Sequence, residues 1–214
     1  MFDIKVVTNV ISSNLLEMLY CDFENSVNQV LPGRRFNTNL GYAKKILLPI
    51  IKEYLPGDWI VDGGNYFETT RPYRLHCDTG KDQIKKLYYN IVIPIKLWAN
   101  NYNPNLNKLI ITNQTWTDDA AFFVKGDNSK DEYNKCITEY DNVGNLSNST
   151  DKLLIDLCPH LNVENLLGFN IKDSVNWNPG DMILFKRHFI HTTSDWRLSG
   201  VYKKLGLSFF TSYK

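Results

Sequence analysis

Long apolar runs, paired cysteines and an excess of either charge are all missing from this chain of 214 residues. No stretch approaches the roughly 20 apolar residues that a membrane-spanning helix needs, so we expect no membrane partner. The four cysteines are never spaced as Cys-x-x-Cys, which argues against a zinc or dithiol motif. The first residues carry an acid early and lack a long apolar core, so we expect no signal peptide, and a cytoplasmic protein with free thiols.

Charge excludes a further class of partner. The chain has 24 basic and 23 acidic residues and a net charge of +1, and no basic groove interleaved with aromatic residues is evident. Nucleic acid is therefore not an expected partner. A hydrophobic fraction of 43% is enough to build one substantial core.

Hydrophobic spacing predicts a mainly β fold with flanking α-helices. Apolar residues recur every three or four positions in two segments, which predicts helices at 12–20 and 39–54. Short apolar or alternating runs predict strands at 3–10, 59–62, 71–78, 87–98, 109–115, 182–185 and 203–210. Many short strands after N-terminal helices favour a double-stranded β-helix, or jelly roll.

We expect one domain over residues 1–214. Within it, 1–70 would support the fold, and 71–214 would form the jelly-roll core with an insertion at about 116–176. The polar stretch 127–150 inside this insertion is typical of a surface loop, and a short helix is expected at 150–158.

A His-x-Asp triplet at His76 and Asp78 is the most informative short motif. Side chains two positions apart on a strand point to the same face, so these two could bind one ligand. A distant His191 follows a Pro-Gly-Asp turn and a short apolar run. Two imidazoles and one carboxylate on one side of a metal leave the other side open, as is typical of non-haem Fe(II) oxygenases. The alternative is a structural histidine hydrogen-bonded to Asp78.

The order of these features resembles the Fe(II)/2-oxoglutarate-dependent dioxygenase superfamily. The shared pattern is the Gly-Asp turn, the apolar strand, the distal histidine, and a basic residue about a dozen positions later that opens the last strand. The resemblance covers residues 73–211. It implies Fe(II) held by His76, Asp78 and His191, 2-oxoglutarate as cosubstrate, and hydroxylation of a substrate with release of succinate and carbon dioxide.

The same resemblance implies a cation for the far carboxylate of 2-oxoglutarate, and two lysines open the last strand. Lys204 shares a strand face with Gly206 and Ser208, where small residues leave room for a ligand, whereas Lys203 shares the apolar face. We therefore expect Lys204 and Ser208 to bind the cosubstrate. Most of the superfamily has arginine here, and Arg197 is an alternative cation in an expected loop.

Other candidates complete the expected pocket, each with ordinary packing or ion pairing as its alternative. Tyr88 and Asn90 are expected to share a face of the strand after the triplet and could bind the cosubstrate. The substrate, a small molecule or a peptide, could meet Arg74, Arg187 or His188. Two other functions stay open: a cupin-like metalloenzyme that does not use 2-oxoglutarate, which the lysine favours, and a non-catalytic jelly-roll binding protein.

Overall fold

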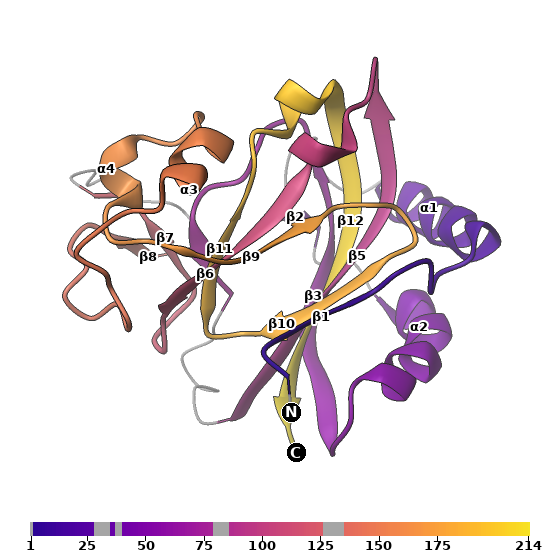
Figure 1. The fold of residues 1–214 in the computed structure, drawn as a ribbon. Coiled ribbons are helices and arrows are strands. Elements are labelled where there is room, and N and C mark those ends of the chain that lie inside the picture. Colours follow the sequence, from indigo (N-terminus) through magenta and orange to yellow (C-terminus); the bar gives the residue numbers. More distant parts are fainter. Residues whose placement is uncertain (1, 28–34, 37–39, 79–85, 126–134) are drawn as a thin grey trace.

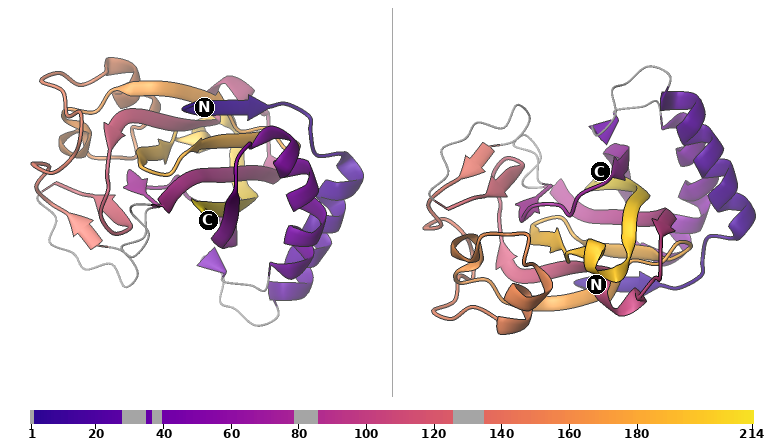
Figure 2. Two further views of the ribbon diagram at one scale, coloured as in Figure 1. Left: turned by 90° about the horizontal axis from the view of Figure 1, so that it is seen from below. Right: turned by 90° about the horizontal axis from the view of Figure 1, so that it is seen from above.

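Two six-stranded sheets face one another and form the body of the molecule (Figure 1). The computed structural model describes residues 2–27, 35–36, 40–78, 86–125 and 135–214. The first sheet has the order β1-β10-β5-β12-β3-β2 and the second has the order β8-β7-β4-β11-β6-β9. The N- and C-termini lie at the same end of the first sheet (Figure 1), and the two views of Figure 2 show them apart from one another.

The first sheet is built on three long antiparallel strands, with β12 between β5 and β3. Its strands are β1 (Ile4–Val7), β2 (Arg35–Phe36), β3 (Trp59–Thr69), β5 (Leu87–Ala99), β10 (Met182–Lys186) and β12 (Val201–Tyr213). One face of this sheet is apolar because β5 and β12 place isoleucine, leucine and phenylalanine there at every second position.

The second sheet has shorter strands and carries the His-x-Asp triplet. Its strands are β4 (His76–Cys77), β6 (Lys108–Thr115), β7 (Ala121–Phe123), β8 (Lys135–Ile137), β9 (Ile171–Asn176) and β11 (Phe189–Thr193). The central strand β11 pairs with β4 on one side and with β6 on the other. The core between the two sheets is formed by residues such as Leu109, Trp177 and Phe185.

Two helices, α1 (Ser13–Val27) and α2 (Gly41–Tyr54), cover the outer face of the first sheet (Figure 2). Helix α2 buries Ala43, Leu47 and Ile51, which recur every four residues and so form one stripe. Two short helices, α3 (Lys152–Leu157) and α4 (Val163–Leu166), pack beside the second sheet, and two 3-10 turns, η2 (Pro104–Leu106) and η3 (Trp196–Ser199), precede β6 and β12. None of the helices in the described ranges is both long and apolar enough to span a membrane.

The predicted fold class is confirmed, and so are most of the predicted elements. The strand expected at 71–78 is reduced to His76–Cys77. Strand β3 is longer than the strand expected at 59–62, because it continues straight through Gly63 and Gly64. A Cβ at Gly64 would lie 2.5 Å from the Ser208 carbonyl oxygen, so glycine serves the close approach of β3 to β12 here.

The region expected as an insertion holds regular structure. Strands β7, β8 and β9 and helices α3 and α4 lie within it, and they share a core that includes Phe123, Tyr140 and Phe169. Of the loop expected at 127–150, residues 127–134 lie outside the described part of the chain. The short helix expected at 150–158 is α3, and the Asp151 carboxylate caps it by accepting from the Leu153 N–H.

Candidate metal centre

The two histidines and the aspartate predicted from the sequence lie together between the sheets. Their ligand atoms all fall within 4.8 Å of one another. The Asp78 Oδ2 atom is 3.3 Å from His191 Nε2 and 3.8 Å from His76 Nε2. Both imidazoles are buried, and their ring centres are 4.1 Å apart. The structure therefore presents two Nε2 atoms and one carboxylate oxygen to the same small volume.

Strand pairing explains this meeting of distant residues. His191 in β11 lies directly opposite His76 in β4, so their side chains leave the sheet on the same face. Asp78 follows the last residue of β4 and is two positions from His76, which keeps it on that face. Asn90 Nδ2 lies 3.5 Å from Asp78 Oδ2, and the buried Asn90 Oδ1 has no hydrogen-bond partner among the described residues.

The backbone fixes which nitrogen of each histidine carries the proton. His76 Nδ1 is 2.8 Å from the Arg74 carbonyl oxygen, and His191 Nδ1 is 3.1 Å from the Phe189 carbonyl oxygen. A carbonyl oxygen only accepts, so each Nδ1 carries the hydrogen and each Nε2 keeps its lone pair. Such outer hydrogen bonds are the usual support of metal-binding histidines. The donor set therefore fits a divalent metal such as Fe(II).

A cavity of about 130 Å³ adjoins the three ligands. It lies between β3 and β12 of the first sheet and β4 and β11 of the second. Beyond the three ligands its lining residues are Asn65, Phe67, Glu68, Thr69, Tyr73, Val92, Leu109, Trp177, Thr193, Trp196, Lys204 and Ser208.

Lys204 is the cation of this cavity, and it is 1% exposed. Its Nζ donates to Asn107 Oδ1 at 2.8 Å and lies 4.5 Å from the ring centre of Trp177 and 5.3 Å from that of Trp196. Burial lowers the pKa of Lys204 well below its usual value of 10.5. In the described ranges no carboxylate pairs with it, and the neighbouring Lys203 pairs with Glu68 at 3.1 Å instead. The cavity thus offers an anion a buried cation whose charge is uncompensated.

The strand face predicted to carry the ligand is only partly open. Ser208 lines the cavity and lies opposite Asn65 across the β12–β3 pair. A Cβ at Gly206 would lie 2.4 Å from Phe67 Cζ, so the space beside this glycine is filled by the Phe67 ring. Gly206 was expected to leave room for a ligand. The Phe67 ring, which is part of the cavity wall, fills that space instead.

The structure places Tyr88 outside the cavity and Asn90 beside Asp78. The Tyr88 hydroxyl donates to the Pro56 carbonyl oxygen at 2.5 Å, and its ring packs in the core beneath the helices. The two residues do not share a face as expected, because the β12–β5 pairing shifts register between Phe210 and Ser212, opposite this part of β5. The alternation of residues along β5 gives no indication of such a register shift.

The three residues expected to meet a substrate do not line the cavity. Arg74 is exposed and lies over the Phe122 ring at 5.5 Å. Arg187 is buried and pairs with Asp62 at 2.8 Å. His188 belongs to the turn between β10 and β11 and lines a separate surface depression, where burial lowers its pKa.

Some residues in and beside the cavity were not singled out from the sequence. Tyr73 packs edge-on against the His76 ring at 4.5 Å between ring centres, and Trp196 and Asn107 surround the Lys204 ammonium. The closeness of Tyr73 to the triplet was the one signal that could have marked it.

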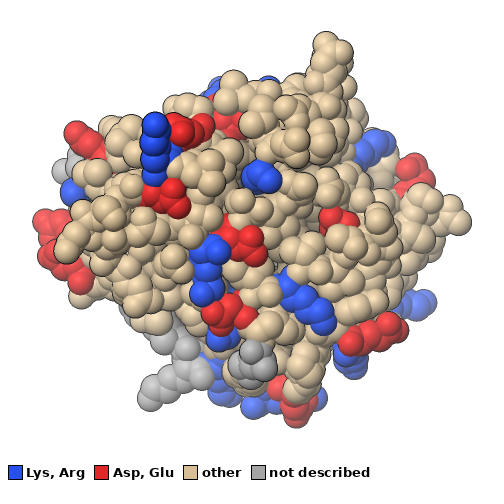
Figure 3. Space-filling model, viewed as in Figure 1, with Lys and Arg blue, Asp and Glu red and all other residues tan. Residues whose placement is uncertain are grey.

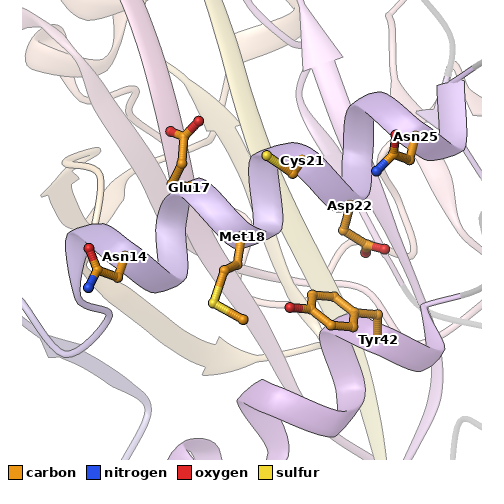
Figure 4. A pocket seen from close by; sticks show the side chains of 7 residues that line it. All are labelled: Asn14, Glu17, Met18, Cys21, Asp22, Asn25 and Tyr42. Atoms are coloured by element: carbon orange, nitrogen blue, oxygen red, sulfur yellow. The ribbon is translucent and has the colours of Figure 1, made fainter.

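A larger, open groove of about 570 Å³ lies on the opposite side of the first sheet, along α1 (Figure 4). Its lining side chains include Glu17, Cys21, Asp22 and Tyr42. It contains no imidazole, and no group of metal-binding side chains was found there among the described residues. The charges on the face seen in Figure 3 are of mixed sign. We therefore place the candidate site in the cavity between the sheets.

Comparison with known proteins supports the same architecture. No family model matches the chain, and no curated protein matches it. Solved structures match over 99% of the chain. HygX from Streptomyces hygroscopicus, with nickel and 2-oxoglutarate bound, is 13% identical with a TM-score of 0.52 over 83% of its length. SnoN, a non-heme alpha-ketoglutarate-dependent epimerase from nogalamycin biosynthesis, is 10% identical with a TM-score of 0.54 over 78%.

EctD from S. alaskensis is a third similar structure, 11% identical with a TM-score of 0.51 over 73% of its length and 99% of this chain. At these identities the likeness concerns the fold, and the two facing sheets with flanking helices are what the proteins share. The chain has the double-stranded β-helix fold of the Fe(II)/2-oxoglutarate-dependent oxygenases.

Proposed function

We propose that this protein is an Fe(II)- and 2-oxoglutarate-dependent oxygenase that hydroxylates a substrate and releases succinate and carbon dioxide. The observation that carries the proposal is the content of one cavity, which combines a His-Asp-His ligand set with a buried, uncompensated lysine. The first feature suits Fe(II), and the second suits an anion that binds beside the metal.

His76, Asp78 and His191 would hold the metal through Nε2, a carboxylate oxygen and Nε2. Bound Fe(II) would supply the activation of dioxygen that couples decarboxylation of 2-oxoglutarate to oxidation of the substrate. The backbone carbonyls of Arg74 and Phe189 keep both imidazoles in the required tautomer and orientation. These hydrogen bonds thus hold both imidazoles in the orientation that metal binding requires.

Lys204 would bind the far carboxylate of 2-oxoglutarate, and the Ser208 hydroxyl can donate a further hydrogen bond. Trp177 and Trp196, 2% and 0% exposed, keep water away from the ammonium. In such a dry site the attraction between ammonium and carboxylate is much stronger than in water. Their ring faces also favour the charged form of the lysine.

The volume of the cavity indicates which of the two ligands it can enclose. About 130 Å³ is well below the roughly 300–1,000 Å³ of pockets that enclose drug-sized ligands. We infer that the cavity takes the small cosubstrate and that the substrate binds at its opening. A solved structure of HygX holds hygromycin B together with nickel and 2-oxoglutarate, which supports a small molecule as the class of substrate.

The four cysteines support a reducing location. The described part of the chain forms no disulfide between Cys21, Cys77, Cys136 and Cys158. Cysteines outside disulfides suit the cytoplasm, where disulfides are rare, and we propose that location on this ground.

The experiment that tests the function is an anaerobic titration of Fe(II)-loaded protein with 2-oxoglutarate, followed through the weak charge-transfer band in the visible range. The proposal requires the band in the wild type and its weakening in Lys204→Ala. Iron binding without a band would favour the cupin-like alternative, and no stoichiometric iron binding would favour the non-catalytic one.

A further inference from the structure

The guanidinium of Arg187 links the candidate metal ligand Asp78 to the first sheet. Arg187 lies in the turn between β10 and β11, and its side chain is 5% exposed. Its Nη1 donates to Asp62 Oδ2 at 2.8 Å, to the Thr211 carbonyl oxygen at 3.1 Å and to Ser212 Oγ at 3.3 Å. Asp62 belongs to β3, and the other two belong to β12. One terminal nitrogen of the guanidinium, Nη1, is therefore hydrogen-bonded to two long strands, β3 and β12.

The other terminal nitrogen, Nη2, contacts the candidate metal centre. Arg187 Nη2 donates to the Asp78 carbonyl oxygen at 3.1 Å. The Arg187 carbonyl oxygen in turn accepts from the Cys77 thiol at 3.2 Å. Arg187 thus contacts both residues that follow His76, and the position of the Asp78 backbone decides where its carboxylate can point.

A buried arginine–aspartate pair needs a reason, because burial costs each ion several kcal/mol of solvation that pairing only partly restores. The Asp62 carboxylate is 8% exposed and also accepts from the Ser212 hydroxyl. The pair lies off the cavity, since neither residue lines it. Substrate binding therefore does not account for the pair, whereas its contact with Asp78 does.

We propose that Arg187, held in place by Asp62, is a positioning residue that sets the place of the Asp78 carboxylate and so the affinity and geometry of the metal site. This inference rests on the proposed function, in which Asp78 is a metal ligand. It depends on the fork of arginine, whose two terminal nitrogens reach Asp62 and Asp78 at once. A lysine offers a single ammonium and can keep only the pairing with Asp62.

The test is a titration of the metal-free protein with Co(II), a spectroscopic substitute for Fe(II) whose visible bands report the ligand geometry. Arg187→Lys keeps the charge opposite Asp62. The double variant Arg187→Gln/Asp62→Asn removes both charges and so leaves neither ion unpaired. Arg197→Lys is the matched control, because the half-exposed Arg197 makes a two-pronged pair with the buried carboxylate of Asp195, which is not a metal ligand.

We expect the Co(II) affinity to fall about 10- to 100-fold in Arg187→Lys and in the double variant, with shifted bands, as for other outer supports of metal ligands. The Co(II) affinity of the control should stay within about twofold of the wild type, since the hydrogen bonds of Arg197 go to Asp195 and not to a residue of the metal site. A folded Arg187→Lys with wild-type affinity and spectrum would overturn the inference. Failure of both variants to fold would overturn it as well, because the contact would then serve the fold as a whole.

His76→Ala separates this inference from the proposed function in the same titration. If His76→Ala loses Co(II) binding while both Arg187 variants keep it, only the positioning role fails. If His76→Ala keeps wild-type affinity, the metal site itself is wrong and the proposed function fails with it.

Discussion

Replacing Lys204 by methionine is expected to change two properties independently: the affinity for 2-oxoglutarate falls, and the stability of the ligand-free protein does not. Methionine has a similar length and no charge, and its thioether packs well against the rings of Trp177 and Trp196. In the ligand-free protein, Lys204 is buried, with Asn107 as its hydrogen-bond acceptor and a pKa that burial holds far below 10.5.

The magnitudes follow from the burial of the ammonium. Exchange of a buried ion for an apolar group of similar volume is neutral or stabilising by about 1–4 kcal/mol. The Asn107 Oδ1 atom loses its donor, which costs about 1–3 kcal/mol, so the two effects nearly cancel and the free energy of unfolding should stay within about 1 kcal/mol of the wild-type value. In the complex, the carboxylate would be buried without a partner, which costs about 3–5 kcal/mol, or about 10²- to 10³-fold in affinity.

The buried lysine also determines the direction in which the free energy of unfolding changes with pH. The pKa of Lys204 is lower in the folded protein than in the unfolded chain, so the unfolded chain binds more protons between the two values. The free energy of unfolding of the wild type should therefore rise with pH in that window, by at most about 1.4 kcal/mol per unit, and level off above about 10.5. Lys204→Met should lack this rise.

Urea unfolding over a range of pH measures the stability, and calorimetry with 2-oxoglutarate on the metal-loaded protein measures the affinity. A Lys204→Met variant that binds 2-oxoglutarate as the wild type does would refute the assignment of the cation. A loss of more than about 1 kcal/mol in the ligand-free protein would refute the statement that the ammonium is an uncompensated charge.

Three further predictions follow from the same cavity. His76→Ala and Asp78→Ala should each abolish stoichiometric Fe(II) binding, measured by anaerobic titration, and full retention in both would contradict the ligand set. Gly206→Val should destabilise the protein by about 1–3 kcal/mol in urea unfolding and narrow the cavity, because its Cβ would meet the Phe67 ring at 2.4 Å; wild-type stability would mean that the ring moves freely. The affinity for 2-oxoglutarate should fall with rising pH above the lowered pKa of free Lys204, because binding favours the protonated lysine; calorimetry that shows a flat profile in wild type would argue against this.

The parts of the molecule governed by local periodicity could be predicted from the sequence. The helical spacing of Ala43, Leu47 and Ile51 corresponds to the buried stripe of α2. Two-residue parity on a strand placed His76 and Asp78 on one face and separated Lys204 from Lys203, and the structure has the same arrangement. These features depend only on neighbours in the chain.

Contacts between distant segments could not be predicted. Asn107 and Trp196 meet Lys204 only because η2 and η3 come together beside the end of β12. The register shift opposite Tyr88 is set by the partner strand and leaves no pattern in β5 itself. For Arg187 the sequence left open substrate binding or an ion pair, and it could not name the partner, Asp62, which belongs to a strand far away in the sequence.

The direct pairing of His191 with His76 has a consequence for folding as well as for chemistry. A metal at this site would be a cross-link between two segments that lie more than half the chain apart, and it would tie the two-residue strand β4 to its neighbour β11. Metal binding requires this folded arrangement, so the free energy of binding would add to the free energy of unfolding. Iron supply would then change how stable the protein is, and a cell short of iron would hold it in a less stable form.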